Sequence, residues 1–215
     1  MIFFRKIIAI MTTVFCCAAA YGQQVDNPHG QSLAAVRAGN LAKLKELEQQ
    51  GANLNSRNRV GESLLMMAIK AENKEIASYL LDKGVNVNVA NTSKVTPLMA
   101  AAYLGDLSIV NRLLEKDADI HAVDQLKKTA IVYAAGQGKT QVVARLLKAG
   151  IDVNARYPND LTVLMWAAGQ GHPDTVKFLL GAGADAALKE NRGKTALELA
   201  DEAGHLDVKK VLGGQ

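Results

Sequence analysis

Residues 96–122 read TPLMAAAYLGDLSIVNRLLEKDADIHA, and residues 162–188 read TVLMWAAGQGHPDTVKFLLGAGADAAL. Both stretches follow the same order of hydroxyl, apolar, small and glycine residues. Similar strings occur five times, and the residues that open them recur every 33 positions: Ser63, Thr96, Thr129, Thr162 and Thr195. A strict period of this length predicts a solenoid, in which each repeat buries its apolar face against its neighbours.

Two further series keep the same period. One holds glycines in mid-repeat (Gly39, Gly105, Gly138, Gly171 and Gly204), and the other lies near its end (Gly51, Gly84, Asp117, Gly150 and Gly183). We expect the hydroxyl residue to be a helix N-cap and the mid-repeat glycine to end that helix with a positive φ. Residues 108–114, SIVNRLL, then show the apolar spacing of a second amphipathic helix. Each repeat is therefore predicted to contain two helices followed by a polar loop.

These strings resemble ankyrin repeats over about residues 27 to 215. The resemblance implies an all-α ankyrin-repeat solenoid of helix-turn-helix units with β-hairpin loops, which recognises proteins through its hairpin tips and the concave face of its inner helices. We divide the chain into six units: 27–59, 60–92, 93–125, 126–158, 159–191 and a truncated 192–215. Because this motif is specific for the fold and not for function, the partner has to be inferred from particular side chains.

The family's usual histidine in the string TPLH is absent from every unit. Other residues take its place: Met66, Met99, Val132, Met165 and Glu198. We expect this to replace an inter-repeat hydrogen-bond network with apolar packing.

The first 22 residues have the pattern of a secretory signal peptide. Arg5 and Lys6 precede an uncharged apolar run over 7–20, and small residues lead to a cleavage point after Gly22. The run is shorter than the roughly 20 residues of a membrane-spanning helix. Cys16 and Cys17 lie inside it, and Phe15 is not the small residue that a lipid-modified cysteine requires. We therefore expect a periplasmic chain without cysteines that is not inserted in the membrane, with full secretion as the alternative.

Charge and composition argue against several functions. The whole chain has a net charge of +4, and removing Arg5 and Lys6 leaves +2. Unit 126–158 carries +5 while the units on either side carry −2 each, which is a basic belt in one repeat. Nucleic-acid binding requires basic residues gathered on one surface, so we expect no nucleic-acid partner.

No motif for catalysis or cofactor binding survives inspection. Residues 136–140, GQGKT, resemble the end of a phosphate-binding loop but lack its first glycine and its preceding strand. His172 and His205 lie one period apart, too distant to share a metal, so we interpret them as capping or turn residues. The chain has no nucleophile elbow and no zinc-protease motif. We expect neither enzymatic activity, nor a cofactor, nor a bound metal.

The candidate partner-binding residues occupy hairpin tips and the concave side of the inner helices. They are Val95, Tyr103, Leu104, Lys128, Gln137, Tyr157, Leu161, Trp166 and Gln170. Several are large apolar groups at positions that the repeat does not need for its core, and exposed aromatic groups are typical binding hot spots. Whether Trp166 and Tyr133 pack in the core or line the groove stays open. We expect a monomer that binds one partner protein as a scaffold, an inhibitor or a protective partner, or an exported effector or accessory subunit.

Overall fold

The computed structural model describes residues 28–213, so the expected signal peptide at 1–22 lies outside the described residues. The described chain contains twelve α-helices and one short 3₁₀-helix, η1, joined by turns and loops. Their bounds are α2 (Pro28–Arg37), α3 (Leu41–Gln49), α4 (Leu64–Lys70), α5 (Lys74–Asp82), α6 (Pro97–Leu104), α7 (Leu107–Glu115), α8 (Ala130–Gly136), α9 (Thr140–Lys148), η1 (Pro158–Asp160), α10 (Val163–Gly169), α11 (Pro173–Gly181), α12 (Ala196–Glu202) and α13 (Leu206–Gly213). One helix pair falls in each of the six units.

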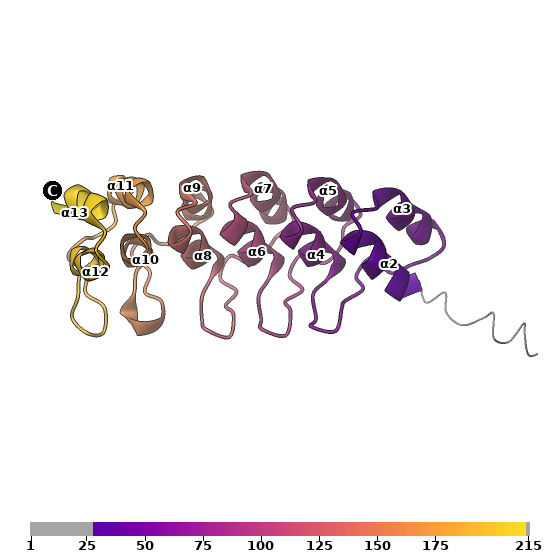
Figure 1. Cartoon of the computed structure of the whole chain (residues 1–215), viewed down its shortest axis with the longest axis horizontal. Helices are drawn as coiled ribbons and strands as arrows, with labels where there is room; N and C mark the ends of the chain where they lie inside the picture. The colour runs from indigo at the N-terminus through magenta and orange to yellow at the C-terminus, as the bar shows by residue number, and fades with distance from the viewer. Residues whose placement is uncertain (1–27, 214–215) are drawn as a thin grey trace, which may run out of the picture.

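The helix pairs stack side by side in two layers (Figure 1). The even-numbered helices form one layer, here called the inner layer, and the odd-numbered helices form the outer layer. The two helices of each pair pack on each other, and from α4 onward each helix also packs on the equivalent helix of a neighbouring pair, as α8 does on α10. Long loops project from the inner layer along one edge of the molecule (Figure 1). The expected all-α solenoid is therefore confirmed.

Five of these loops fall one period apart at 57–62, 90–95, 123–128, 156–161 and 189–194, and we call them the hairpin loops. Each is closed by a backbone hydrogen bond across four residues, such as Asn91 N to Val95 O at 3.0 Å and Asp124 N to Lys128 O at 3.0 Å. Only Arg57 and Ser63 form a β-bridge, so the described chain has hairpin-like loops without extended strands.

Four of the five hydroxyl residues cap the inner helices as predicted. Ser63, Thr96, Thr162 and Thr195 accept a bond from the helix N3 backbone, whereas Thr129 makes no cap bond to α8. Both glycine series have positive φ at every glycine, including +83° at Gly105, which confirms their role as helix terminators.

The core lies between the layers and runs the whole length of the stack. The residues in place of the family histidine are buried at Met66, Met99, Val132 and Met165. The methionines do more than fill space, because Met99 Sδ accepts a bond from Thr96 N at 3.4 Å and Met165 Sδ one from Thr162 N at 3.5 Å. A sulfur acceptor thus takes part in capping, which the sequence interpretation of plain apolar packing missed.

Candidate functional site

An aromatic strip crosses the inner layer on the edge that carries the hairpin loops. Tyr103, at the end of α6, is 47% exposed, and its ring meets the Tyr133 ring of α8 edge-on at 6.1 Å. The strip continues to Trp166 of α10, whose ring centre lies 4.7 Å from the ammonium nitrogen of Lys128. Because the same ammonium lies 5.9 Å from the Tyr133 ring, Lys128 joins the two aromatic residues through cation–π contacts.

The Asp124 carboxylate fixes both the loop that carries Lys128 and the ring of Tyr133. Its Oδ1 accepts bonds from the backbone N–H groups of Leu126 and Lys128, both at 2.8 Å, and so shapes the loop. Its Oδ2 accepts the Tyr133 hydroxyl at 2.6 Å. Burial, together with this bond to a carboxylate, raises the pKa of Tyr133 to about 12. The hydroxyl therefore stays protonated well into the alkaline range, and its bond to Asp124 holds the ring in place.

Two grooves flank the strip. The first, of about 280 Å³, lies across α4, α6 and α8 and is lined by Met66, Lys70, Asn91, Val95, Met99, Ala100, Tyr103, Leu104 and Tyr133. The second, of about 360 Å³, lies between α10 and α12 and is lined by Leu161, Met165, Trp166, Gly169, Gln170, Arg192, Leu199, Glu202 and Ala203. The first groove is mainly apolar, whereas the second mixes apolar and polar groups, and both are suited to binding side chains of another molecule.

The structure brings most of the candidate residues together. Val95, Tyr103 and Leu104 line the first groove, Leu161, Trp166 and Gln170 line the second, and Lys128 lies between them. Gln137 and Tyr157 line neither groove. Trp166 and Tyr133, left open by the sequence, are half-buried: they pack against the core and also face a groove.

One part of the sequence interpretation needs correction. The large apolar side chains were expected at positions that the core does not need, and this holds for Tyr103 alone. Val95, Leu104, Tyr157 and Leu161 are half-buried and pack against the core. Burial raises the pKa of Tyr157, in keeping with a structural position. Sequence inspection also missed Val60 and Leu126, which are 51% and 66% exposed on hairpin loops.

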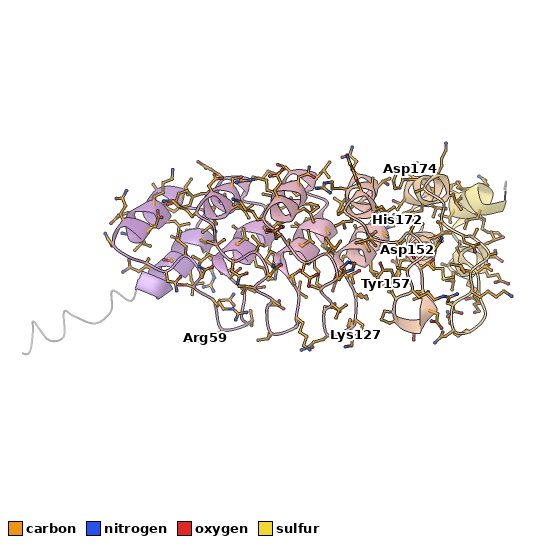
Figure 2. The ribbon with its side chains drawn as sticks, turned by 180° about the vertical axis from the view of Figure 1, so that it is seen from behind. Arg59, Lys127, Asp152, Tyr157, His172 and Asp174 are labelled. Atoms are coloured by element: carbon orange, nitrogen blue, oxygen red, sulfur yellow. The ribbon has the colours of Figure 1, made fainter. Side chains whose placement is uncertain are left out.

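The basic residues form an edge rather than a belt. The five hairpin loops carry nine basic and four acidic residues, a net charge of +5, whereas the other described residues carry 14 basic and 16 acidic ones. Figure 2 shows Arg59 and Lys127 at the tips of their loops, far from Asp174 on α11. The net charges of single units do not reveal this basic edge, because residues one period apart come together in the folded chain. We call the five loops together the basic edge.

His172 and His205 join neighbouring units and do not cap helices with their side chains. His172 lies at the start of α11 without a cap bond, and its Nε2 is 3.0 Å from the Gly136 carbonyl oxygen of the preceding unit. His205 Nε2 lies 3.2 Å from Gly169 O in the same way. The segment 136–140 is the turn between α8 and α9, as its register with the other repeats predicted. Residues 28–213 contain no cluster of three or more His, Cys, Asp or Glu side chains that could hold a metal ion.

Comparison with known proteins identifies the repeat. A family model described as ankyrin repeats (3 copies) matches residues 32–124, 99–190 and 131–214. No curated protein matches the chain by sequence. Within residues 28–213, every helix is too short or too polar to span a bilayer.

Proposed function

The chain belongs to the ankyrin repeat family, and on that premise we propose that it is a non-catalytic module that holds a partner protein against its grooves and hairpin loops. Ankyrin repeats generally serve as protein–protein interaction modules. The partner is proposed to contact the aromatic strip and the two grooves beside it.

The exposure of Tyr103 carries the proposal. Its ring is 47% exposed although it stands among half-buried apolar residues at the mouth of the first groove. A large aromatic side chain costs little conformational entropy when a partner covers it, and hot spots consist of such residues beside pockets. Asp124 and Tyr133 hold the neighbouring ring in place, so the surface is formed before a partner arrives.

The test is affinity capture from an envelope extract with the chain beginning at Gln23. Tyr103→Ala is expected to lose most of the captured partner, because it removes the exposed ring without opening the core. Leu206→Ala is the matched control, since Leu206 is a 66% exposed apolar residue at the start of α13. If both variants capture the same partner as the unchanged chain, the contact surface is misplaced.

We also propose that the protein acts in the periplasm after loss of residues 1–22. The support is the sequence pattern alone: Arg5 and Lys6, the uncharged run and the small residues before Gln23. Cell fractionation with N-terminal sequencing tests this directly, and the expected mature chain begins at Gln23. Recovery from the culture medium would favour the exported effector instead, and a cytoplasmic chain that keeps Met1 would overturn both proposals.

A further inference from the structure

The charged side chains of the basic edge are unevenly exposed. Seven of its nine basic residues are exposed, whereas Asp160 is the single exposed acidic residue. Asp124 and Glu190 are buried, at 4% and 5% exposure, where they accept backbone bonds that shape their loops. Glu62 is paired with Lys70 at 2.6 Å. The surface that a partner meets is therefore more basic than the net charge of the loops indicates.

The first three hairpin loops each present an exposed basic residue near the turn: Arg59, Lys94 and Lys127, of which Lys94 and Lys127 lie one period apart. None of them forms an ion pair with another residue of the described chain. Lys94 and Lys127 have φ of +61° and sit at the turn of their loops, which directs them away from the core. Holding like charges in a row costs free energy in the isolated protein, and an anionic partner would recover it.

Apolar side chains stand directly beside these charges. Val60 follows Arg59, Leu126 precedes Lys127, and Val95 follows Lys94 at the rim of the first groove. The first two are more than half exposed. A complementary ligand must therefore offer acidic groups and large apolar groups in alternation.

We propose that the partner contributes an acidic, extended segment whose carboxylates meet Arg59, Lys94 and Lys127, and whose large apolar side chain enters the groove beside Tyr103. This rests on the proposed function and names the chemistry of its partner. Equivalent helices of neighbouring repeats are about 10 Å apart. An extended chain rises about 3.3 Å per residue, so successive tips are matched by acidic residues about three positions apart.

The same edge fits a nucleic acid poorly. Sequence-tolerant binding of single strands needs open aromatic faces on which bases stack. Here Tyr103 is the one exposed aromatic residue of the strip, while Tyr133 and Trp166 are half-buried with the ammonium of Lys128 over their rings, so there is no row of open faces for successive bases. The apolar groove and the exposed Val60 and Leu126 also have no counterpart on a phosphate backbone. Oligonucleotide binding therefore enters as an outcome of the test.

The experiment selects peptides from a random library displayed on phage, with the chain from Gln23 as bait. Enriched peptides are expected to be net acidic, with acidic residues about three positions apart and at least one aromatic or large aliphatic residue. Fluorescence anisotropy then measures their affinity for the triple variant Arg59→Glu, Lys94→Glu and Lys127→Glu. We expect a loss of at least about tenfold near 0.05 M salt, reduced severalfold near 0.5 M salt because ions screen exposed charges.

The matched control changes the net charge equally on the outer layer. It carries Lys116→Glu, Lys148→Glu and Lys177→Glu, all at exposed positions without an ion pair in the described chain. The control is expected to bind within about twofold of the unchanged chain, since the inner layer separates the outer layer from the hairpin loops (Figure 1) and salt screens charges over distance.

Several results would overturn the acidic-segment proposal. These are neutral or basic peptides among the binders, equal losses in the two triple variants, no enrichment at all, or tighter binding of a random single-stranded oligonucleotide. Tyr103→Ala separates this proposal from the function it rests on. Peptides that need Tyr103 but carry no acidic residues would refute the charge inference alone. Capture and peptide binding that both ignore Tyr103 would refute the contact surface itself.

Discussion

At the scale of single residues, Gly138 shows how a missing side chain links two repeats. Its φ is +65°, and a Cβ there would lie 2.7 Å from His172 Nδ1. The imidazole can therefore reach the turn, where its Nε2 lies 3.0 Å from Gly136 O. Gly138→Ala should lower the free energy of unfolding by about 1–3 kcal/mol, because it strains the backbone and displaces this bond. Urea denaturation measures the loss.

Gly136 supplies the control two positions away. It is the last residue of α8, and a Cβ there meets nothing within 4 Å. Gly136→Ala should stabilise the protein by about 0.4–1 kcal/mol, since it restricts only the unfolded chain. Equal effects of the two substitutions would show that His172 does not require the open position at Gly138.

Tyr133 makes the stability of the fold depend on alkaline pH. Its pKa is about 12 in the folded chain, through burial and the bond to Asp124, against about 10 in an unfolded chain. The folded state therefore keeps a proton that the unfolded state releases. The stabilisation from this phenol is complete below about pH 10 and declines as the pH rises toward 12. Tyr133→Phe should remove that part of the decline in urea denaturation series, whereas Tyr103→Phe should keep it, because it leaves the bond to Asp124 intact.

At the scale of elements, a column of asparagines in the segments that follow the outer helices ties successive repeats together. Asn88 accepts a bond from Asp119 N at 2.9 Å and donates one to Asp117 O at 3.0 Å. Asn154 repeats both bonds to the following unit. His121 stands in the same column, and the described structure has neither bond there. A shallow depression open to solvent, lined in part by His121 and Arg145, lies at this junction.

His121→Asn should therefore repair the junction between units 93–125 and 126–158. The new amide can bond to Asp152 N and Gly150 O, which we expect to raise the free energy of unfolding by about 0.5–1.5 kcal/mol. The reverse substitution, Asn88→His, should lower it by a similar amount. Urea denaturation of both variants tests the pair, and a loss of stability in His121→Asn would mean that the repeats are too far apart there for the bond.

The loops mark where sequence reasoning was sufficient and where it failed. The period predicted the helices because their caps and terminators, such as Thr96 and Gly105, act within a few residues of themselves. The period did not predict the contacts between repeats. Backbone bonds join successive hairpin loops, from Thr92 N to Val60 O and from Gln125 N to Ser93 O. The next donor in the series is Pro158, which has no N–H, so the series breaks there and resumes at Asn191.

The candidate site follows the same division. Tyr103 and Leu104 could be assigned to the groove side of the inner layer because their place in the repeat fixes the helix face. The half-burial of Tyr157 could not be predicted, because it depends on the irregular loop around η1, where Asn159 has φ of +64°. The cation–π contact between Lys128 and Trp166 joins residues of different units, so no local sequence pattern predicts it.

At the scale of the whole molecule, the direction of stacking decides which equivalent residues are buried. Leu65, Leu98, Ile131 and Leu164 form one column, and each is at most 1% exposed because the next repeat covers it. Leu197 continues the column in the last unit and is 37% exposed. Terminal repeats of a solenoid have one uncovered face, and here that face is the one beyond α12.

The same Leu→Ala substitution at a covered and at an uncovered position of this column tests the stacking of the repeats. Leu164→Ala should cost about 2–5 kcal/mol of unfolding free energy, because it removes buried methyl groups and leaves a cavity between α10 and α12. Leu197→Ala should cost about 1 kcal/mol or less, since part of that side chain already contacts water. Urea denaturation of both variants gives the comparison. Equal costs would mean that Leu197 is covered in solution, as it would be by a second molecule packed against the last repeat.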